Sequence, residues 1–464
     1  MFGLEQLRKP SLIESILIVC AVLFLLGFPM IFMEGMVPHI PILVSIVFLL
    51  LYGLCHRVPF EKMQESMIKS VDTSMGAIYL FFFIGVLISV LMMSGAIPTL
   101  MYFGLEIIGT KVFYLSVFCI TALVGLSIGS SLTTIATLGV AFLGIAHALD
   151  LNLAITAGAA VSGAFFGDKM SPLSDTTSIA ASIVGVDLFV HIKNMMYTTI
   201  PAFIISLIVF FMLSPNTAGG DVSSVTQFKD ALESTGLIHA DALLLFVLLI
   251  VLSIFKAPAV VSIIITSIAG LGIAEVHAGY SFSEIAGFLF GGFKMDALPE
   301  GVTSLISRGG ISSMFFTITI VTLALSLGGL LFGLGIIPTL LESIAHLINT
   351  ASKATLLAAS VALGVNFVVG EQYLSILLTG KTLKPVYDKL NLEPKNLSRT
   401  LEDAGTVINA LVPWGVSGVF VSSMLGVEVI AYTPFAVFCY ASLLLTLFYG
   451  ITGLTLTKKE VVAE

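Results

Sequence analysis

The segment 167–177 reads Gly-Asp-Lys-Met-Ser-Pro-Leu-Ser-Asp-Thr-Thr and gathers charged and hydroxyl side chains between apolar runs. Charged side chains in an apolar stretch are costly at the centre of a bilayer and usually mark an ion path. Carboxylate and hydroxyl oxygens suit a small hard cation such as Na⁺. We therefore predict a Na⁺ site with two carboxylates, two hydroxyls and one ammonium that offsets charge when the site is empty: Asp168, Asp175, Ser174, Thr176 and Lys169.

Pro172 predicts that the helix through this segment is broken. Proline has no backbone N–H and its ring clashes with the carbonyl four residues earlier, which here is that of Asp168, so this carbonyl is expected to be free. The second half repeats the arrangement, because Pro413 follows Asn409 by four residues. Two breaks with a free carbonyl beside a polar side chain suit Na⁺ better than a large organic molecule. The alternative is that Asp168 and Lys169 form an inert buried pair and Pro172 only a kink.

Two long apolar stretches with polar, glycine-rich centres, 112–149 and 353–380, are predicted to be hairpins that enter the membrane and return. Irregular backbone at this depth is tolerated only where it is buried in protein or lines a cavity. If the hairpin tips reach the helix breaks, they add further oxygens to the ion site: Ser130, Ser131 and Thr133 from the first hairpin, Asn366 and Glu371 from the second. The alternative for the hydroxyls is hydrogen bonding back to their own helices.

Acidic residues in the second half need separate interpretations. Glu371 is followed by an amide inside a run of Val, Leu and Ile, where an acid has few structural uses, so we predict that it is functional. Glu402 and Asp403 begin the last broken helix, and acids in a first turn favour the helix dipole. One of the two is therefore explained as a capping charge. Asp403 precedes Asn409 by less than two turns and is assigned to the same cavity, with the capping role left open.

The elements that position these residues are membrane-spanning helices. The chain has 464 residues, of which 57% are apolar and 10% charged, whereas a soluble domain has about a quarter charged. This composition excludes a soluble fold and predicts an all-α polytopic protein with the lipid bilayer as its partner. No Lys/Arg cluster is dense enough for nucleic acid. About 20 apolar residues are needed for a helix to cross the membrane once. Uninterrupted membrane-spanning helices are therefore predicted at 12–33, 37–54, 74–96, 192–213, 239–256, 258–274, 311–336 and 430–456.

Short sequence motifs recur at a spacing of 240 or 241 residues, which predicts that the chain consists of two repeats. Ile-Pro-Thr-Leu stands at 97–100 and again at 337–340, and Pro172 aligns with Pro413. We predict a first repeat at 1–213, an extracytoplasmic linker at 214–238 and a second repeat at 239–464. With about five spans each, the repeats have opposite orientations. Lys and Arg then lie mostly on one side, as cytoplasmic loops require, with both termini inside the cell.

The possible energy sources for transport limit the functional classes that the protein can belong to. No Walker motif, dinucleotide fingerprint or nucleophile elbow is present, so neither an enzyme nor a cofactor is predicted. Energy must then come from an ion gradient. A carboxylate can hold Na⁺ or H⁺, and exchange follows if the two exclude one another and the empty site does not cross the membrane. An ion channel is the alternative class, and it predicts flux that does not couple H⁺ to Na⁺.

The sequence resembles the NhaC family of bacterial sodium/proton antiporters. The resemblance rests on four features: the motif at 167–177, the segment Asp-Leu-Phe-Val-His-Ile-Lys-Asn-Met-Met-Tyr-Thr-Thr at 187–199, the hairpin at 125–144 and the motif Ile-Pro-Thr-Leu. It implies exchange of Na⁺ for H⁺ across the bacterial inner membrane by inverted repeats with re-entrant hairpins. Some family members exchange Na⁺-lactate against malate and protons, so a Na⁺-coupled organic acid exchanger is the alternative. A homodimer is suggested only by analogy with transporters of this kind.

Overall fold

The computed structural model describes residues 5–33, 36–72, 74–107, 110–215, 222–255, 257–295, 306–345 and 348–459. Over these residues the chain is helical, and the single pairing of β type is an isolated bridge between Leu392 and Lys458. Six helices in this part of the chain are long and apolar enough to cross a membrane, and three bent helix pairs pass the same test as pairs. The prediction of an all-α polytopic membrane protein with broken helices is confirmed.

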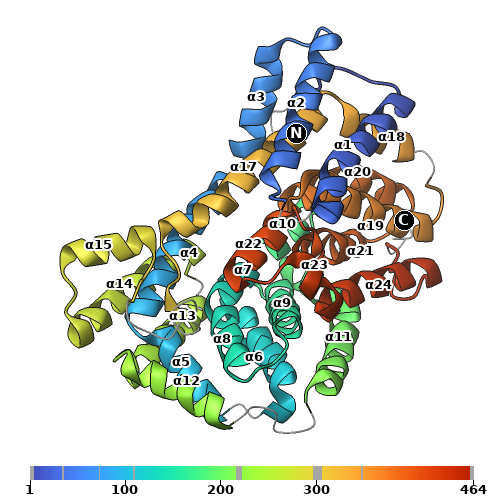
Figure 1. Ribbon diagram of the computed structural model, residues 1–464. Helices are drawn as coiled ribbons and strands as arrows, with labels where there is room; N and C mark the ends of the chain where they lie inside the picture. The colour runs from blue at the N-terminus through green and yellow to red at the C-terminus, as the bar shows by residue number, and fades with distance from the viewer. Residues whose placement is uncertain are drawn as a thin grey trace.

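Most of the predicted plain spans are found as helices to within a few residues, but the span predicted at 430–456 is bent by 61° between Phe435 and Val437. The peripheral helices include short ones that are not among the predicted spans. They form two groups joined by the long helix α17, which packs against α2 and α3 at one end and against α4 and α15 at the other (Figure 1). The bounds are α1 Leu12–Phe32, α2 His39–Cys55, α3 Phe60–Asp72, α4 Met75–Met93, α5 Ala96–Ile107, α13 Leu244–Ile254, α14 Ala259–Ala278, α15 Phe282–Gly291, α17 Ile311–Gly333 and α18 Ile336–Ala345. The linker contains α12 (Val222–Ser234), and 216–221 lie outside the described residues.

Each predicted hairpin is a pair of helices joined at a tight turn, and each is followed by a broken helix. The first set comprises α6 Phe113–Ile128, α7 Ser131–Thr134, the π-helical turn η2 Ile135–Gly139, α8 Val140–Ala148, α9 Leu153–Met170, α10 Asp175–Val184 and α11 Leu188–Leu213. The second comprises α19 Ala351–Val369, α20 Gln372–Lys389, α21 Pro394–Leu401, the π-helical turn η4 Glu402–Thr406, the 3₁₀ turn η5 Asn409–Leu411, α22 Val416–Leu425, α23 Val429–Tyr432 and α24 Val437–Thr452.

Element boundaries recur at the spacing that the repeated words predict. Helix α10 (Asp175–Val184) becomes α22 (Val416–Leu425) when 241 is added to its residue numbers. The left-handed residues recur as well: Gly129 has φ 71° and Gly370 has φ 77°, while Asp150 and Asn391 have φ 49° and 52°. A left-handed residue other than glycine is uncommon, so its recurrence at equivalent positions supports the duplication.

The two sets pack against each other reciprocally. Helix α9 contacts α24, and its equivalent α21 contacts α11, the equivalent of α24. In the same way α10 contacts α20, whereas α22 contacts η2, α7 and α8, which together correspond to α20. This reciprocal packing places both helix breaks in the centre of the molecule, where α9, α10 and α22 lie close together in Figure 1.

A glycine contact fixes the first hairpin against the helix that carries Asp168. A Cβ atom on Gly167 would lie 2.2 Å from the Leu126 nitrogen and 2.4 Å from the Gly125 carbonyl carbon, whereas one on Gly272 in α14 would meet nothing within 4 Å. We expect Gly167→Ala to destabilise the protein by about 1–3 kcal/mol, the usual cost of overpacking. Gly272→Ala is the matched control. Thermal denaturation of the purified variants tests this, and equal melting temperatures would contradict the packing argument.

Candidate cation-binding site

The tip of the first hairpin lies on the first helix break, as predicted. Asp168, in the last turn of α9, accepts hydrogen bonds through Oδ2 from the Ser131 hydroxyl at 2.7 Å and from the Ser131 N–H at 3.2 Å. The carboxylate is 4% exposed, and among the residues that the structure describes its Oδ1 has no hydrogen-bond partner. Ser131 follows Gly129, whose left-handed backbone ends α6 and turns the chain toward α9. The hairpin tip therefore leaves one buried carboxylate oxygen available for a cation.

The predicted free carbonyls are not free. Helix α9 ends at Met170, and the Asp168 carbonyl accepts the Ser171 N–H at 3.1 Å. The Asn409 carbonyl likewise accepts the Val412 N–H, at 3.3 Å. Both helices tighten into a three-residue turn before the proline, which replaces the hydrogen bond that proline cannot donate. Pro172 and Pro413 do mark the breaks, but the coordinating oxygens have to come mainly from side chains.

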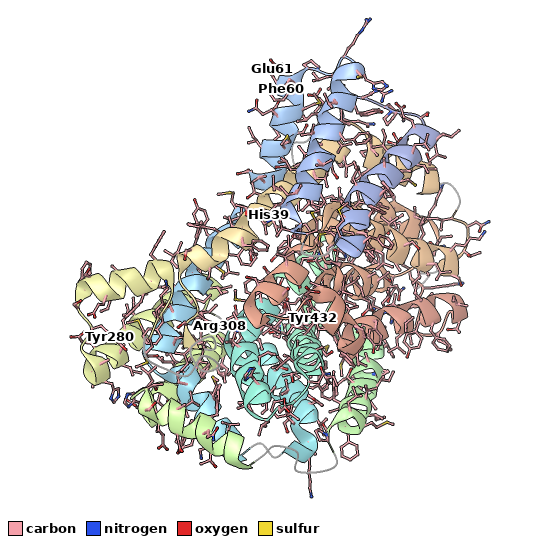
Figure 2. The ribbon with its side chains drawn as sticks, viewed as in Figure 1. His39, Phe60, Glu61, Tyr280, Arg308 and Tyr432 are labelled. Atoms are coloured by element: carbon pink, nitrogen blue, oxygen red, sulfur yellow. The ribbon has the colours of Figure 1, made fainter. Side chains whose placement is uncertain are left out.

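The second hairpin tip lies on the second break and is held by amide groups. Asn366 donates to the carbonyls of Ala404 and Gly405 at 3.0 and 2.7 Å and accepts a hydrogen bond from Asn409 at 2.9 Å. Asn409 also donates to the Gly370 carbonyl at 3.1 Å. Tyr432, which is labelled in Figure 2, also stabilises the second break, because its hydroxyl donates a hydrogen bond to the Ala410 carbonyl at 2.5 Å. Asn366 and Asn409 are thus saturated by the protein and brace the second tip, which differs from their predicted role as ion ligands.

Lys169 pairs with Asp403, not with Asp168. The two side chains form a salt bridge, and both are fully buried. Asp403 also accepts hydrogen bonds from Thr198 on α11, at 3.3 Å, and from Thr446 on α24. The ion pair joins the two sets of helices across 234 residues of sequence. In this structure Asp403 is therefore the partner of Lys169, and the inert Asp168–Lys169 pair of the alternative does not form.

The predicted hydroxyls near the site are mainly helix caps. Ser130 accepts the Thr133 N–H at 3.3 Å and contacts the Thr133 hydroxyl at 3.0 Å. Ser174 begins α10 in the same way, accepting the Thr177 N–H at 3.4 Å and contacting the Thr176 hydroxyl at 3.0 Å. For Ser130 and Thr133 these bonds agree with the alternative of local hydrogen bonding. Ser131 differs, because its hydroxyl bonds to Asp168.

Asp175 and Glu371 lie at the contact between α10 and α20. Asp175 accepts the Tyr373 hydroxyl at 2.5 Å, and Glu371 caps α20 by accepting the Leu374 N–H at 2.7 Å. Glu371 is buried, but Asp175 is exposed in a cavity of 380 Å³ that is also lined by Tyr373 and Ser74. Asp175 is within electrostatic range of Asp168. Asp175 therefore lies at the entrance to the group of carboxylates that includes Asp168 and Glu371. It does not lie beside Asp168 between the hairpin tip and α9.

Glu402 is the functional candidate that sequence reasoning missed. Its side chain is fully buried in η4, and neither carboxylate oxygen has a hydrogen-bond partner in the described part of the structure. It lies within electrostatic range of Asp168 and Lys169. The spacing of 241 residues contained a signal, because Glu402 aligns with Val161 in the interior of α9 and not with a helix end.

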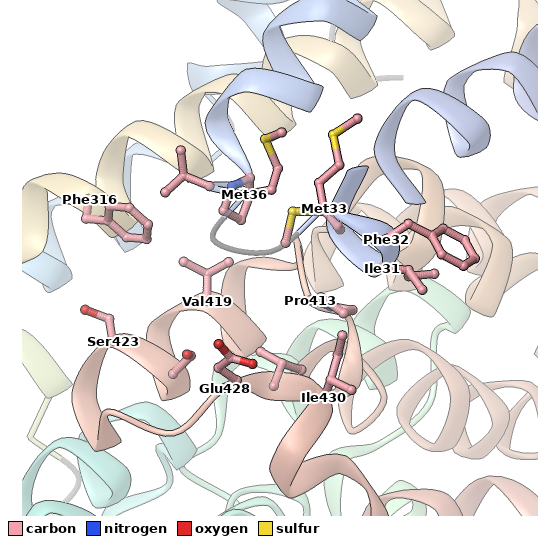
Figure 3. A pocket seen from close by; sticks show the side chains of 15 residues that line it. Ile31, Phe32, Met33, Met36, Phe316, Pro413, Val419, Ser423, Glu428 and Ile430 are labelled. Carbon is pink, nitrogen blue, oxygen red and sulfur yellow. The ribbon is translucent and has the colours of Figure 1, made fainter. Parts of the chain in front are cut away.

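A larger cavity of 590 Å³ adjoins the second break. Pro413, Val419 and Glu428 line one side, and Met33 and Met36 lie across from them (Figure 3). The cavity at Asp175 adjoins the start of α10, directly after the first break. Each helix break thus borders a hollow that is formed by a different set of helices.

Paired hairpins, broken helices and buried carboxylates where they meet are the features of an ion-coupled membrane transporter. The Na⁺/H⁺ antiporter family model matches residues 163–454, and the chain belongs to this family. It is 39% identical to the Na⁺/H⁺ antiporter NhaC of Alkalihalophilus pseudofirmus over 99% of both chains. It is also 39% identical to the NhaC of Bacillus subtilis, over 89% of this chain and 92% of that protein. The malate-2H⁺/Na⁺-lactate antiporter of Bacillus subtilis is 31% identical, over 97% and 96%.

Proposed function

We infer that the protein exchanges Na⁺ for H⁺ across the bacterial plasma membrane, with Asp168 as the carboxylate that binds the two ions alternately. The observation that carries this proposal is the state of Asp168, which is buried, is held by Ser131 through Oδ2 and has Oδ1 without a partner. A buried carboxylate without a paired cation is costly. Binding of Na⁺ or of a proton relieves that cost, so the loaded site crosses the membrane more readily than the empty one.

The arrangement of the halves supports alternating access. We take 1–213 and 239–464 as inverted repeats, because the reciprocal packing of α9 and α21 is what a two-fold relation would produce and an odd number of spans would reverse the second repeat. On this path the cavity at Asp175 opens to the cytoplasm and the cavity at Pro413 to the outside. The C-terminal segment packs on a predicted cytoplasmic loop, since Lys459 N–H donates to the Asn391 carbonyl at 2.8 Å. This contact agrees with a cytoplasmic C-terminus.

Organic acid exchange remains the second candidate because of the malate and lactate relative. In that mechanism Lys169 would be the counter-ion of a substrate carboxylate. The Lys169 ammonium is already engaged by Asp403 and lies 3.4 Å from the Thr198 hydroxyl. A substrate would have to displace Asp403 from it, so the geometry favours the cation-only exchanger.

The deciding experiment uses the purified protein in liposomes loaded with a pH dye. Na⁺ is added outside, and proton movement is recorded with and without lactate and malate on opposite sides. We expect Na⁺ alone to drive protons out of the liposomes, and Asp187→Asn, which changes an exposed cap of α11, to behave like the unmodified protein. Proton movement only with the organic acids would establish the second candidate. Na⁺ flux without coupled proton movement would indicate a channel.

A further inference from the structure

The cavity of 590 Å³ beside the second break has walls that the proposed ion exchange does not use. They are mainly apolar, with the thioethers of Met30, Met33 and Met36 at the end of α1 and the ring of Phe316 on α17. Among the described residues that line the cavity, Glu428 is the one charged side chain. Small-molecule sites typically have volumes of about 300–1,000 Å³ and apolar walls with a few polar groups. This cavity therefore has the size and lining of a site for a small organic molecule.

The carboxylate of Glu428 is not used by the fold. Glu428 is the residue before α23, but its side chain makes no hydrogen bond to that helix. Asp187, which lies 241 residues earlier and precedes α11, instead caps its helix by accepting the Phe189 and Val190 N–H groups at 3.0 and 3.1 Å. In Figure 3 the Glu428 carboxylate points into the cavity, on the wall opposite Met33 and Met36. An acid that serves as a cap in the first set of helices thus faces an open space in the second.

The lining determines the chemistry of the ligand. A carboxylate attracts a cation, and the face of a ring such as that of Phe316 also favours a positive charge. Methionine side chains are flexible and polarizable, so they adapt to apolar groups of different shape. Hydrated Na⁺ gains nothing from such walls. An organic cation gains from both, because its charge lies at Glu428 while its apolar part displaces water from the methionines.

We propose that this cavity is a second ligand site, which binds a soluble organic monocation with an apolar or aromatic body. Such a ligand contacts the end of α1 on one wall and Val419 and Glu428 of the second broken-helix set on the other, next to Pro413. It therefore holds the two groups of helices in one arrangement, and we expect it to inhibit exchange. The inhibition rests on the proposed Na⁺/H⁺ exchange, whereas the binding does not.

Binding is tested with benzyltrimethylammonium as the probe and the purified protein in an uncharged maltoside detergent. The dissociation constant is taken from the rise of the melting temperature with ligand concentration. We expect a rise with this cation and none with N-benzylacetamide, a neutral molecule of similar size. Glu428→Gln should bind about tenfold more weakly, because it keeps the shape of the cavity and removes its charge. Asp187→Asn is the matched control and should bind like the unmodified protein, since Asp187 caps α11.

Equal affinity of Glu428→Gln and the unmodified protein would overturn the proposal, as would equal binding of N-benzylacetamide. Ile430→Trp is a second variant: Ile430 lines the cavity and is 52% exposed, so the larger side chain fills the space without entering the core. Binding should be lost in this variant, and retained binding would place the ligand elsewhere. Phosphatidylethanolamine carries an ammonium headgroup and should leave the dissociation constant unchanged. Competition by this lipid would assign the site to a headgroup and overturn the choice of a soluble ligand.

Inhibition is measured in liposomes with the probe on both sides of the membrane. A quaternary ammonium cannot carry protons across the bilayer, so the probe leaves the pH gradient intact. Na⁺-driven proton movement should fall to about half at a concentration near the dissociation constant. Relative to its own rate without the probe, Glu428→Gln should need about tenfold more. Binding without inhibition would overturn the bridging argument. If the proposed function fails, the liposomes show no Na⁺-driven proton movement, while binding in detergent still depends on Glu428.

Discussion

Asp168→Asn is expected to abolish Na⁺-driven proton movement while the protein remains folded. Asparagine has nearly the same shape and can still accept the Ser131 hydroxyl hydrogen bond that Asp168 accepts at 2.7 Å. It can neither carry the charge that attracts Na⁺ nor bind the proton that replaces it. We expect at least about a 100-fold loss of exchange rate, because the two ions lose most of their differential binding energy at the site. Fluorescence of a pH dye in liposomes measures the rate.

Ligand-induced stabilisation separates loss of the site from loss of the fold. A ligand that binds only the folded protein raises the melting temperature, and the effect grows with the logarithm of its concentration once this exceeds the Kd. Na⁺ should therefore raise the melting temperature of the unmodified protein and leave that of Asp168→Asn unchanged, whereas Asp187→Asn should respond like the unmodified protein. Full exchange activity in Asp168→Asn would contradict the assignment of the site, whatever the melting curves show.

Ser131→Ala probes how the hairpin tip contributes to the same site. Ser131 bonds to Asp168 through both its hydroxyl and its N–H, and the substitution removes only the hydroxyl. We therefore expect the affinity for Na⁺ to fall about tenfold, which is the usual effect of removing a hydrogen bond to a charged group. Exchange itself should be retained. Ser130→Ala is the control, because Ser130 caps its own turn and makes no bond to Asp168.

Local chemistry explains why the breaks and hairpin tips could be predicted. A proline removes one donor and displaces one carbonyl wherever it stands in a helix, so Pro172 and Pro413 mark the breaks without knowledge of the fold. Polar, glycine-rich centres in apolar stretches likewise mark tips that must be buried. The Ser131–Asp168 contact follows from these two features together. Short sequence motifs predict a repeat at a spacing of 241 residues, and the left-handed backbone conformation of Asp150 recurs at Asn391 with the same spacing.

The pairing of charges could not be predicted, because it depends on which helix faces each side chain. Asp168 and Lys169 are neighbours in sequence, and on a helix such neighbours point about 100° apart. Only the packing of both α9 and η4 against α24 brings Lys169 to Asp403. The same reason explains Glu402, which looks like a capping charge when helix α21 is assumed to begin there. The broken helix begins at Pro394 with α21, and Glu402 follows Leu401 directly in the π-helical turn η4, so it does not lie in a first turn.

Separate removal of Lys169 and of Asp403 is expected to be far more harmful than their joint removal. Both side chains are fully buried, and each neutralises the other. A single substitution leaves an unpaired buried charge, which costs about 3–5 kcal/mol. We expect Lys169→Met and Asp403→Asn each to lower the melting temperature strongly, and the double variant to melt above either single variant. Lys459→Met is the control, because its 2.8 Å pair with Asp388 is exposed and such pairs contribute little.

The double variant also decides whether the ion pair takes part in exchange. If Lys169 and Asp403 only hold α9, α11, η4 and α24 together, the double variant should still exchange Na⁺ for H⁺, because Asp168 remains. Additive destabilisation in the double-mutant cycle would mean that the two charges do not interact. A stable double variant without exchange would move the ion pair into the transport mechanism, since its charges would then be needed for something other than the fold.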